Sequence, residues 1–218
     1  SLIDNIIGID IAQWDGKQFD NYQHHQIDVR NEDAMEKAFQ GIDVVIHLAF
    51  IVLTNKLDLD YILDVNINGS KIVFRSAAKA GVSKIIYTSS VAAYGMHKET
   101  SIPLLEDSPL DGYLNENYYY AYSKSIVERE LDIFEENHPD IIVTRFRPHI
   151  IVGPTYIENT GNLDTLLGNL ISSNSRNFAL KPLNIKHTDQ KQTQYTSEKD
   201  LVEAILIAIR RNVRGAFN

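Results

Sequence analysis

Short apolar runs of strand length alternate with helical patterns along most of this chain, and this alternation constrains the fold more than any other feature. The strand-like runs lie at 5–10, 23–28, 43–49, 84–90 and 141–146. Helical patterns separate the last four of these runs, at 31–40, 59–80 and 117–137. Because parallel strands need a long crossover connection, usually a helix, this order predicts an α/β fold with a doubly wound, Rossmann-type parallel sheet.

The composition and periodicity of the sequence change after Gly153. From there to residue 195, Asn, Thr, Ser and Lys become frequent and the hydrophobic periodicity weakens. The residues from Ser197 to Asp200 then resemble a capping box that opens a last helix. We therefore expect a Rossmann-like domain over 1–152, a small separate region at 153–195, and a helix and strand at 196–218 that return to the core.

Composition excludes several classes of partner. The net charge of −8 counts against a nucleic-acid surface, because phosphate binding needs clustered Lys and Arg. The absence of cysteine excludes disulfides and thiolate metal sites and fits a reducing cytoplasm, and the remaining His, Asp and Glu show no metal-ligand spacing. No apolar run reaches the ~18 residues that a membrane span needs, and the first residues lack a signal peptide's basic region. We expect a cytoplasmic protein with no nucleic-acid, membrane or metal partner.

Tyr120 and Lys124 form the pair with the clearest chemical meaning, because four residues apart on a helix they share a face. A free phenol has a pKa near ~10, and a nearby ammonium lowers it toward the operating pH. Ser90, at the end of a neighbouring strand, offers a hydroxyl that can hold a substrate oxygen beside the phenol. These three groups can move a proton while a cofactor moves a hydride.

The spacing alone also arises by chance, because the run at 118–122 contains four tyrosines. Only Tyr120 has a lysine at the fourth position after it. We interpret Tyr118, Tyr119 and Tyr122 as core or groove-lining rings.

The acids at the ends of two predicted strands can each have one of two roles. Asp10 can accept hydrogen bonds from the two hydroxyls of an adenosine ribose, or it can cap a turn. Asp28 can meet the adenine edge or cap the helix that follows it. His47 lies among apolar neighbours, which indicates a hydrogen-bonded core histidine.

Together these segments resemble the NAD-dependent epimerase/dehydratase family, the extended short-chain dehydrogenases. The resemblance covers nearly the whole chain, in the family's order. The matching segments are IIGID at 6–10, DVR at 28–30, HLAF at 47–50, VNINGS at 65–70, YTSSVAAYG at 87–95, YYYAYSK at 118–124, RPHIIVGP at 147–154 and QYTSEKDLVEAI at 194–205. Each motif is weak alone, but chance does not explain so many in register.

The resemblance implies a catalytic trio of Ser90, Tyr120 and Lys124, with NAD as cofactor. It assigns NAD(P) binding to 1–152 and substrate binding to 153–195. Asp10 as the ribose acid would repel a 2′-phosphate and so favours NAD over NADP. The residues expected to bind the cofactor are Asp10, Asp28, Val29, Leu48, Ala49, Phe50, Asn66, Ser89, Tyr120, Lys124, Pro148 and Ile150.

Two departures from the family's pattern affect this interpretation. Members begin with a strand and a glycine-rich loop that binds the pyrophosphate, and the 11 glycines here show no such spacing. We expect that part to be truncated, disordered or otherwise absent from this sequence. The family's dehydratases carry Asp-Glu directly after the catalytic hydroxyl, whereas Val91 and Ala92 stand here. Dehydration is therefore disfavoured.

The mechanism predicted by the resemblance has Tyr120 remove a proton from a substrate hydroxyl while NAD⁺ takes a hydride from the same carbon. Lys124 would hold the nicotinamide ribose, and Ser90 would orient the substrate oxygen. The leading substrate is a nucleotide sugar, acted on by an epimerase or dehydrogenase. One alternative is a reductase or dehydrogenase of a non-sugar alcohol or ketone; another is a non-catalytic dinucleotide-binding or interaction module. Family members are often homodimers, which this sequence neither shows nor excludes.

Overall fold

The computed structural model describes residues 3–17, 19–52, 58–95, 103–114, 118–154 and 194–218. The chain divides into two compact units. One comprises residues 1–147 together with 205–218, and the other comprises residues 148–204. All three predicted catalytic residues belong to the first unit. Most of 153–195, the region expected to bind substrate, lies outside the described residues.

The first unit is built on a four-stranded parallel sheet with the order β3-β4-β5-β8. Its strands are β3 (Val44–His47), β4 (Lys84–Thr88), β5 (Ile142–Phe146) and β8 (Gly215–Phe217). The central strand β4 is buried along almost its whole length, as expected for a parallel strand covered on both faces. The prediction of a Rossmann-type parallel α/β fold is confirmed.

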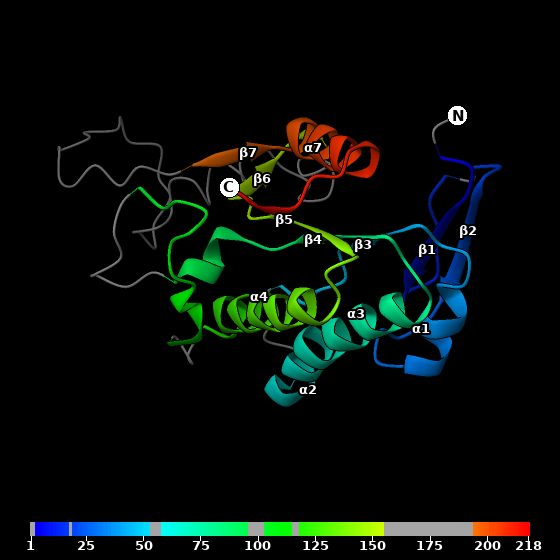
Figure 1. Cartoon of the computed structure of the whole chain (residues 1–218), viewed down its shortest axis with the longest axis horizontal. Helices are drawn as coiled ribbons and strands as arrows, with labels where there is room; N and C mark the ends of the chain where they lie inside the picture. The colour runs from blue at the N-terminus through cyan, green and yellow to red at the C-terminus, as the bar shows by residue number, and fades with distance from the viewer. Residues whose placement is uncertain (1–2, 18, 53–57, 96–102, 115–117, 155–193) are drawn as a thin grey trace, which may run out of the picture. The chain divides into compact units, whose positions relative to one another are not determined.

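A second parallel pair, β1 (Ile6–Asp10) and β2 (Tyr22–Gln26), precedes this sheet in the chain. The strand expected at 5–10 is present, but its residues are exposed or half-buried, unlike those of a parallel strand covered on both faces. Figure 1 shows the pair beside α1 (Glu32–Ala38), the helix that leads from β2 to β3. Asn31 caps that helix by accepting a hydrogen bond from the backbone N–H of Ala34 at 3.1 Å.

Helices α1, α3 (Ser70–Lys79) and α4 (Tyr119–Asn137) form one layer against the sheet, with α3 in contact with both of the others (Figure 1). Their apolar faces meet the sheet in one core. Fully buried members of this core include Phe74, Ala77, Ile85, Val127, Leu131 and Val143. The packing fixes α4, and with it the Tyr120–Lys124 face, against β4.

The single helix expected over 59–80 is broken by a π-helical turn. The segment consists of α2 (Leu59–Leu63), the π turn η1 (Asp64–Gly69) and then α3. Such a turn widens the helix by one residue and is frequent at functional sites. Here it turns the side chains of Asn66 and Ser70 into the protein, and both are fully buried.

The second unit contains a parallel pair, β6 (Ile150–Val152) and β7 (Tyr195–Ser197). The last helix, α7 (Glu198–Arg210), begins in this unit and ends in the first. Ser197 Oγ accepts a hydrogen bond from the backbone N–H of Asp200 at 3.4 Å, consistent with the expected helix start. No helix within the described ranges is long and apolar enough to span a bilayer.

Candidate active site

Tyr120 and Lys124 occupy one face of α4, toward the end of β4. Lys124 is only 3% exposed, and its Nζ donates a hydrogen bond to the carbonyl of Thr88 at 2.7 Å. The same Nζ lies 5.9 Å from the centre of the Tyr120 ring. The helix therefore brings the two groups together as the sequence predicted.

Aromatic rings surround the Lys124 ammonium. Its Nζ lies 3.7 Å from the ring centre of Phe50 and 4.8 Å from that of Tyr87. Phe50 also meets Tyr120 edge-to-face, with ring centres 5.8 Å apart. Cation–π attraction favours such a cage, and Phe50 thereby contacts both members of the reactive pair.

Burial sets the charge of both groups. It lowers the pKa of Lys124 to about 7, although the nearby carboxylate of Glu128 opposes that shift. Burial also raises the pKa of Tyr120, and a side-chain hydrogen bond with Ser90 offsets part of this rise. The expected lowering of the Tyr120 pKa is wrong for this structure, because burial of the phenol outweighs the interactions that lower its pKa.

Ser90 stands at the turn that follows β4. Its Oγ caps the short 3₁₀ helix η2 (Val91–Tyr94) by accepting a hydrogen bond from the backbone N–H of Ala92 at 3.2 Å. The Ser90 hydroxyl also lies close enough to Tyr120 to lower the pKa of the phenol in part. The strand end and the helix thus place the three predicted catalytic side chains in one cluster.

Gly112 allows this turn to approach α4 closely. It lies in η3 (Asp111–Leu114), a 3₁₀ helix that packs on both η2 and α4. A Cβ at Gly112 would fall 2.6 Å from the carbonyl oxygen of Ala121 and 2.9 Å from that of Ala93. Because no larger residue fits there without displacing backbone, the glycine holds the Ser90 turn next to the Tyr120 helix.

Asn66 fixes the loop that follows β3. From the π turn, its Oδ1 accepts a hydrogen bond from the Ile51 N–H at 2.7 Å, and its Nδ2 donates to the Ile51 carbonyl at 2.9 Å. This double contact holds the segment that includes Phe50. That the amide lies near a bound cofactor stays a prediction; both of its polar atoms bind the Ile51 backbone.

The two predicted acids differ in their surroundings. Asp10 is exposed at the end of β1, and its Oδ1 accepts a hydrogen bond from the backbone N–H of Ala12 at 2.8 Å. Asp28 is engaged by the Arg30 guanidinium at 2.6 Å, and this contact lowers the pKa of its carboxyl group. Arg30 also pairs with Asp64 at 3.0 Å. Arg30 therefore links Asp28, in the loop after β2, to the π turn, whereas the Asp10 carboxylate faces solvent.

The other predicted cofactor residues vary in exposure. Val29 and Ser89 are buried, Ala49 is half-buried, and Leu48 is 62% exposed. Pro148 and Ile150 belong to the second unit, and Ile150 is exposed.

His47 is a core histidine, as its apolar neighbours indicated. Its Nε2 lies 2.8 Å from Ser70 Oγ, and burial lowers its pKa to about 3, so it is neutral at physiological pH. Within the described ranges, no group of three or more His, Cys, Asp or Glu side chains is arranged to hold a metal ion.

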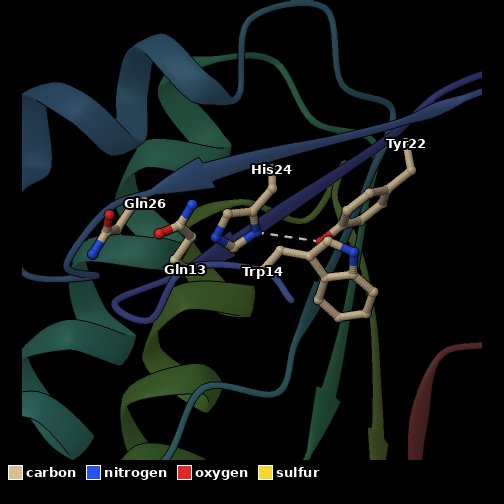
Figure 2. Close-up of a pocket in the computed structure, with 5 residues that line it drawn as sticks. All are labelled: Gln13, Trp14, Tyr22, His24 and Gln26. Carbon is tan, nitrogen blue, oxygen red and sulfur yellow. Dashed lines mark hydrogen bonds between the residues drawn. The ribbon is translucent and has the colours of Figure 1, made fainter. Parts of the chain in front are cut away.

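A shallow pocket lies on the β1–β2 pair, and one of its lining residues, Gln26, is the register partner of Asp10. Figure 2 shows its lining of Gln13, Trp14, Tyr22, His24 and Gln26. The Tyr22 hydroxyl and His24 Nδ1 are 3.3 Å apart. None of the residues expected to bind cofactor or substrate lines this pocket.

Sequence reasoning missed Glu128, which is completely buried one helical turn beyond Lys124. Its carboxylate pairs with Arg147 at the end of β5. The signal that could have found it is the spacing of 120, 124 and 128, which lie on one face of a helix. A charged residue on the buried face of a helix requires a partner of opposite charge.

The fold and this cluster define a class of protein: Rossmann-type α/β proteins with Ser, Tyr and Lys at the carboxyl ends of the strands. The model of the NAD dependent epimerase/dehydratase family matches residues 5–218, and the chain belongs to that family.

Curated relatives span several activities. The chain is 33% identical over 165 residues to an N-acetyl-alpha-D-glucosaminyl-diphospho-ditrans,octacis-undecaprenol 4-epimerase of Escherichia coli O157:H7, covering 72% of this chain and 47% of that protein. It is 29% identical over 147 residues to cinnamoyl-CoA reductase 2 of Medicago truncatula, covering 65% and 42% respectively. The chain therefore spans less than half the length of these relatives.

Solved structures share the fold. The Bordetella bronchiseptica enzyme WbmH, solved with NAD⁺, superposes with a TM-score of 0.71 at 21% identity, covering 99% of this chain and 67% of that one. UDP-glucose 4-epimerase of Bifidobacterium longum, solved with NAD⁺ and UDP, is 28% identical with a TM-score of 0.53, covering 61% and 39%.

Proposed function

We propose that the protein containing this chain is an NAD-dependent oxidoreductase or epimerase that acts at a hydroxyl-bearing carbon, with a nucleotide sugar as its leading substrate class. The observation that carries this proposal is the cluster of three side chains: the Ser90 hydroxyl lies near Tyr120, and Lys124 lies one turn further on the same helix face, with its Nζ 5.9 Å from the Tyr120 ring centre. The two 4-epimerase relatives described above support the substrate class.

The residues of the first unit offer groups that fit both the ribose and the nicotinamide parts of a bound NAD. Asp10 offers an exposed carboxylate to a ribose diol at the end of a parallel strand, where ligands bind in folds of this kind. Lys124 and the loop at Leu48–Phe50 would hold the nicotinamide end. When bound, NAD supplies the site that accepts and returns the hydride.

The side chains of this chain would handle the proton and the orientation. Ser90 Oγ positions the substrate oxygen next to the phenol. Tyr120 Oη takes the hydroxyl proton when the alcohol is oxidised and returns it when the ketone is reduced. Because burial raises the pKa of Tyr120, the phenol is set to donate a proton, and removal of one requires the positive form of Lys124. With a pKa of about 7, that lysine is divided between its two forms near neutral pH.

Dehydration fits the site poorly. The positions directly after Ser90 are Val91 and Ala92, neither of which can transfer a proton. The N–H of Ala92 is already used in capping by Ser90. Epimerisation and simple oxidation or reduction remain, since these need only the hydroxyl, phenol and ammonium.

A reductase of a non-sugar carbonyl compound is the second candidate. The similarity to cinnamoyl-CoA reductase 2 favours it. Such an enzyme would use the same Tyr120 as proton donor, which agrees with a phenol held in its neutral form.

The test is a turnover screen of the full-length protein with a panel of nucleotide sugars and of carbonyl compounds, each with NAD⁺ or NADH. Products are separated by chromatography as well as weighed by mass spectrometry, because an epimer has the same mass as its substrate. Tyr120→Phe should retain NAD binding and lose turnover by roughly 10²-fold or more, because it deletes the proton-transfer group. Tyr122→Phe, two residues away on the same helix, is the matched control and should retain turnover. NAD binding without turnover of any compound would instead support a non-catalytic dinucleotide-binding module, and turnover that survives Tyr120→Phe would overturn the assigned acid–base residue.

A further inference from the structure

Glu128 is the most deeply buried carboxylate among the described residues, with 0% exposure. Its Oε1 accepts a hydrogen bond from Arg147 Nε at 2.8 Å and its Oε2 accepts one from Arg147 Nη2 at 2.9 Å. Arg145 adds a third contact to Oε2 at 3.3 Å. A two-point arginine–carboxylate pair of this kind fixes both orientation and distance. Helix α4 and strand β5 are thereby locked at one point.

Arg147 extends the contact to the turn after Ser90. Its Nη1 donates to the Tyr94 hydroxyl at 2.7 Å and to the carbonyl of Glu106 at 2.8 Å. The Tyr94 hydroxyl donates in turn to Asn218 Oδ1 at 2.7 Å. Tyr94 is 1% exposed and ends the 3₁₀ helix that Ser90 begins. A continuous chain of hydrogen bonds therefore runs from the Lys124 helix to the turn that carries the hydroxyl.

A contact between the ends of two strands adds to this series of hydrogen bonds. The backbone N–H of Ser89 donates to the carbonyl of Phe146 at 2.7 Å, which joins the ends of β4 and β5 next to Arg147. Glu128 lies one helical turn after Lys124 and two turns after Tyr120, on the same face. It is thus the one acid within the described part of α4 that faces both the reactive pair and the arginine.

We propose that Glu128 is a positioning residue of the reaction centre: through Arg147 and Tyr94 it fixes the turn that carries Ser90, and its carboxylate maintains the positive charge of Lys124. The expected effect of Glu128 on turnover rests on the proposed function. Its structural consequence, the charge state of Lys124, can be measured without any substrate.

The other titratable groups that face Lys124 are uncharged near neutral pH, so Glu128 is its counter-charge. His47, from β3, has a pKa of about 3 and is neutral. Tyr87, from β4, is fully buried, and its pKa is raised well above that of a free phenol. The pKa of Tyr120, on the same helix, is raised as well.

Glu128 pairs mainly with Arg147 and Arg145. The hydrogen bond from Arg147 lowers the pKa of the Glu128 carboxyl and so opposes the effect of its burial. Removing this charge should make Lys124 lose its proton more easily.

The first test is an NMR titration of the Lys124 Cε resonance in the full-length protein, assigned with Lys124→Met. In Glu128→Gln, the pKa of Lys124 should fall by about one unit, the usual effect of losing one close opposite charge. Asp132→Asn is the matched control, because it removes a carboxylate of the same helix that contacts Arg145 and is 57% exposed. An unchanged Lys124 pKa in Glu128→Gln, or an equal fall in Asp132→Asn, would overturn the proposal.

The second test uses turnover. Glu128→Gln should lower kcat at least about tenfold, which is less than the full rate gain of ~10²-fold or more that a positioned proton-transfer group gives. NAD affinity should stay near that of the native protein. The high-pH limit of activity should move down with the pKa of Lys124. A variant that melts at a lower temperature but keeps the native kcat and pH profile would show a merely structural role and overturn the proposal.

Tyr94→Phe keeps the proposal testable if Glu128→Gln does not fold. It removes only the hydroxyl between Arg147 and Asn218, and leaves every charge in place. It should lower kcat without changing the Lys124 pKa, because it loosens the Ser90 turn alone. An unaltered kcat in this variant would overturn the positioning role. A protein that turns over no substrate refutes the proposed function, whereas the NMR result still decides the role of Glu128.

Discussion

The ammonium of Lys124 lies 3.7 Å from the ring centre of Phe50, so an aromatic side chain covers the cation on the side of the β3 loop. This contact exists because Asn66, in the π turn, holds both backbone polar groups of Ile51, the next residue along the loop. Any ligand that reaches the Lys124 Nζ from this side must displace the Phe50 ring. The position of one loop therefore controls both the hydration and the accessibility of the lysine.

Phe50→Ala should raise the pKa of Lys124 from about 7 toward the value of a free lysine. Two effects oppose each other here. Losing the cation–π contact disfavours the charged form by about 1–2 kcal/mol, while admitting water removes part of a burial effect that is worth roughly 1.4 kcal/mol for each pKa unit. The burial effect is the larger, so the net shift is upward. The NMR titration of the Lys124 Cε measures it.

Phe50→Leu is the matched control, because it keeps an apolar cover without an aromatic face. It should leave the pKa of Lys124 low or lower it further. A pKa that falls in Phe50→Ala would show that the aromatic contact, and not exclusion of water, dominates the balance at this site.

The buried Lys124 should also make stability depend on pH. Its pKa in the folded state, about 7, lies below the 10.5 of the unfolded chain. Between these two values the unfolded state binds more protons, so stability rises with pH across that window and the penalty is fully present below it. Denaturant unfolding of the native protein between pH 7 and pH 10 should show this rise, and Lys124→Met should lose it. Parallel curves for the two proteins would mean that Lys124 keeps an ordinary pKa.

The chain order and the parallel strands could be predicted from the sequence because they follow from local apolar patterns. The strand runs at 43–49, 84–90 and 141–146 correspond to β3, β4 and β5, with ends that agree within two residues. The Tyr120–Lys124 pair could be predicted as well, because helix geometry alone brings residues four apart together.

Other features of the site depend on tertiary contacts that no local pattern reveals. The π turn at Asp64–Gly69 interrupts a sequence that reads as one regular helix. The low pKa of Lys124 reflects how completely the rings of Phe50 and Tyr87 exclude water, which only the packed structure defines. Glu128 reads as an ordinary helix residue until strand β5 supplies Arg147.

Asp10→Ala should weaken the binding of NAD more than that of NADP. The exposed carboxylate at the end of β1 can accept hydrogen bonds from a ribose diol, and it repels a 2′-phosphate. Its removal costs NAD a charged hydrogen-bond acceptor, worth about 1.5–3 kcal/mol, and relieves the repulsion of NADP. Calorimetric titration of the full-length protein with both dinucleotides checks this, with Asp15→Ala as a control acid. Equal losses for the two would remove the basis for a preference for NAD.

Asn66→Asp should loosen the β3 loop without creating a cavity. The carboxylate can still accept the hydrogen bond from the Ile51 N–H, but it cannot donate to the Ile51 carbonyl, which Nδ2 reaches at 2.9 Å. An unpaired buried acceptor next to a buried charge costs about 1–3 kcal/mol or more. We therefore expect a lower denaturant midpoint and faster hydrogen exchange at the Ile51 amide. The contact between Phe50 and Lys124 should weaken at the same time, which raises the Lys124 pKa as in Phe50→Ala. Asn68→Asp, an exposed change two residues further along the π turn, should do neither. If Asn66→Asp left exchange at Ile51 unchanged, the amide would not be what holds the loop.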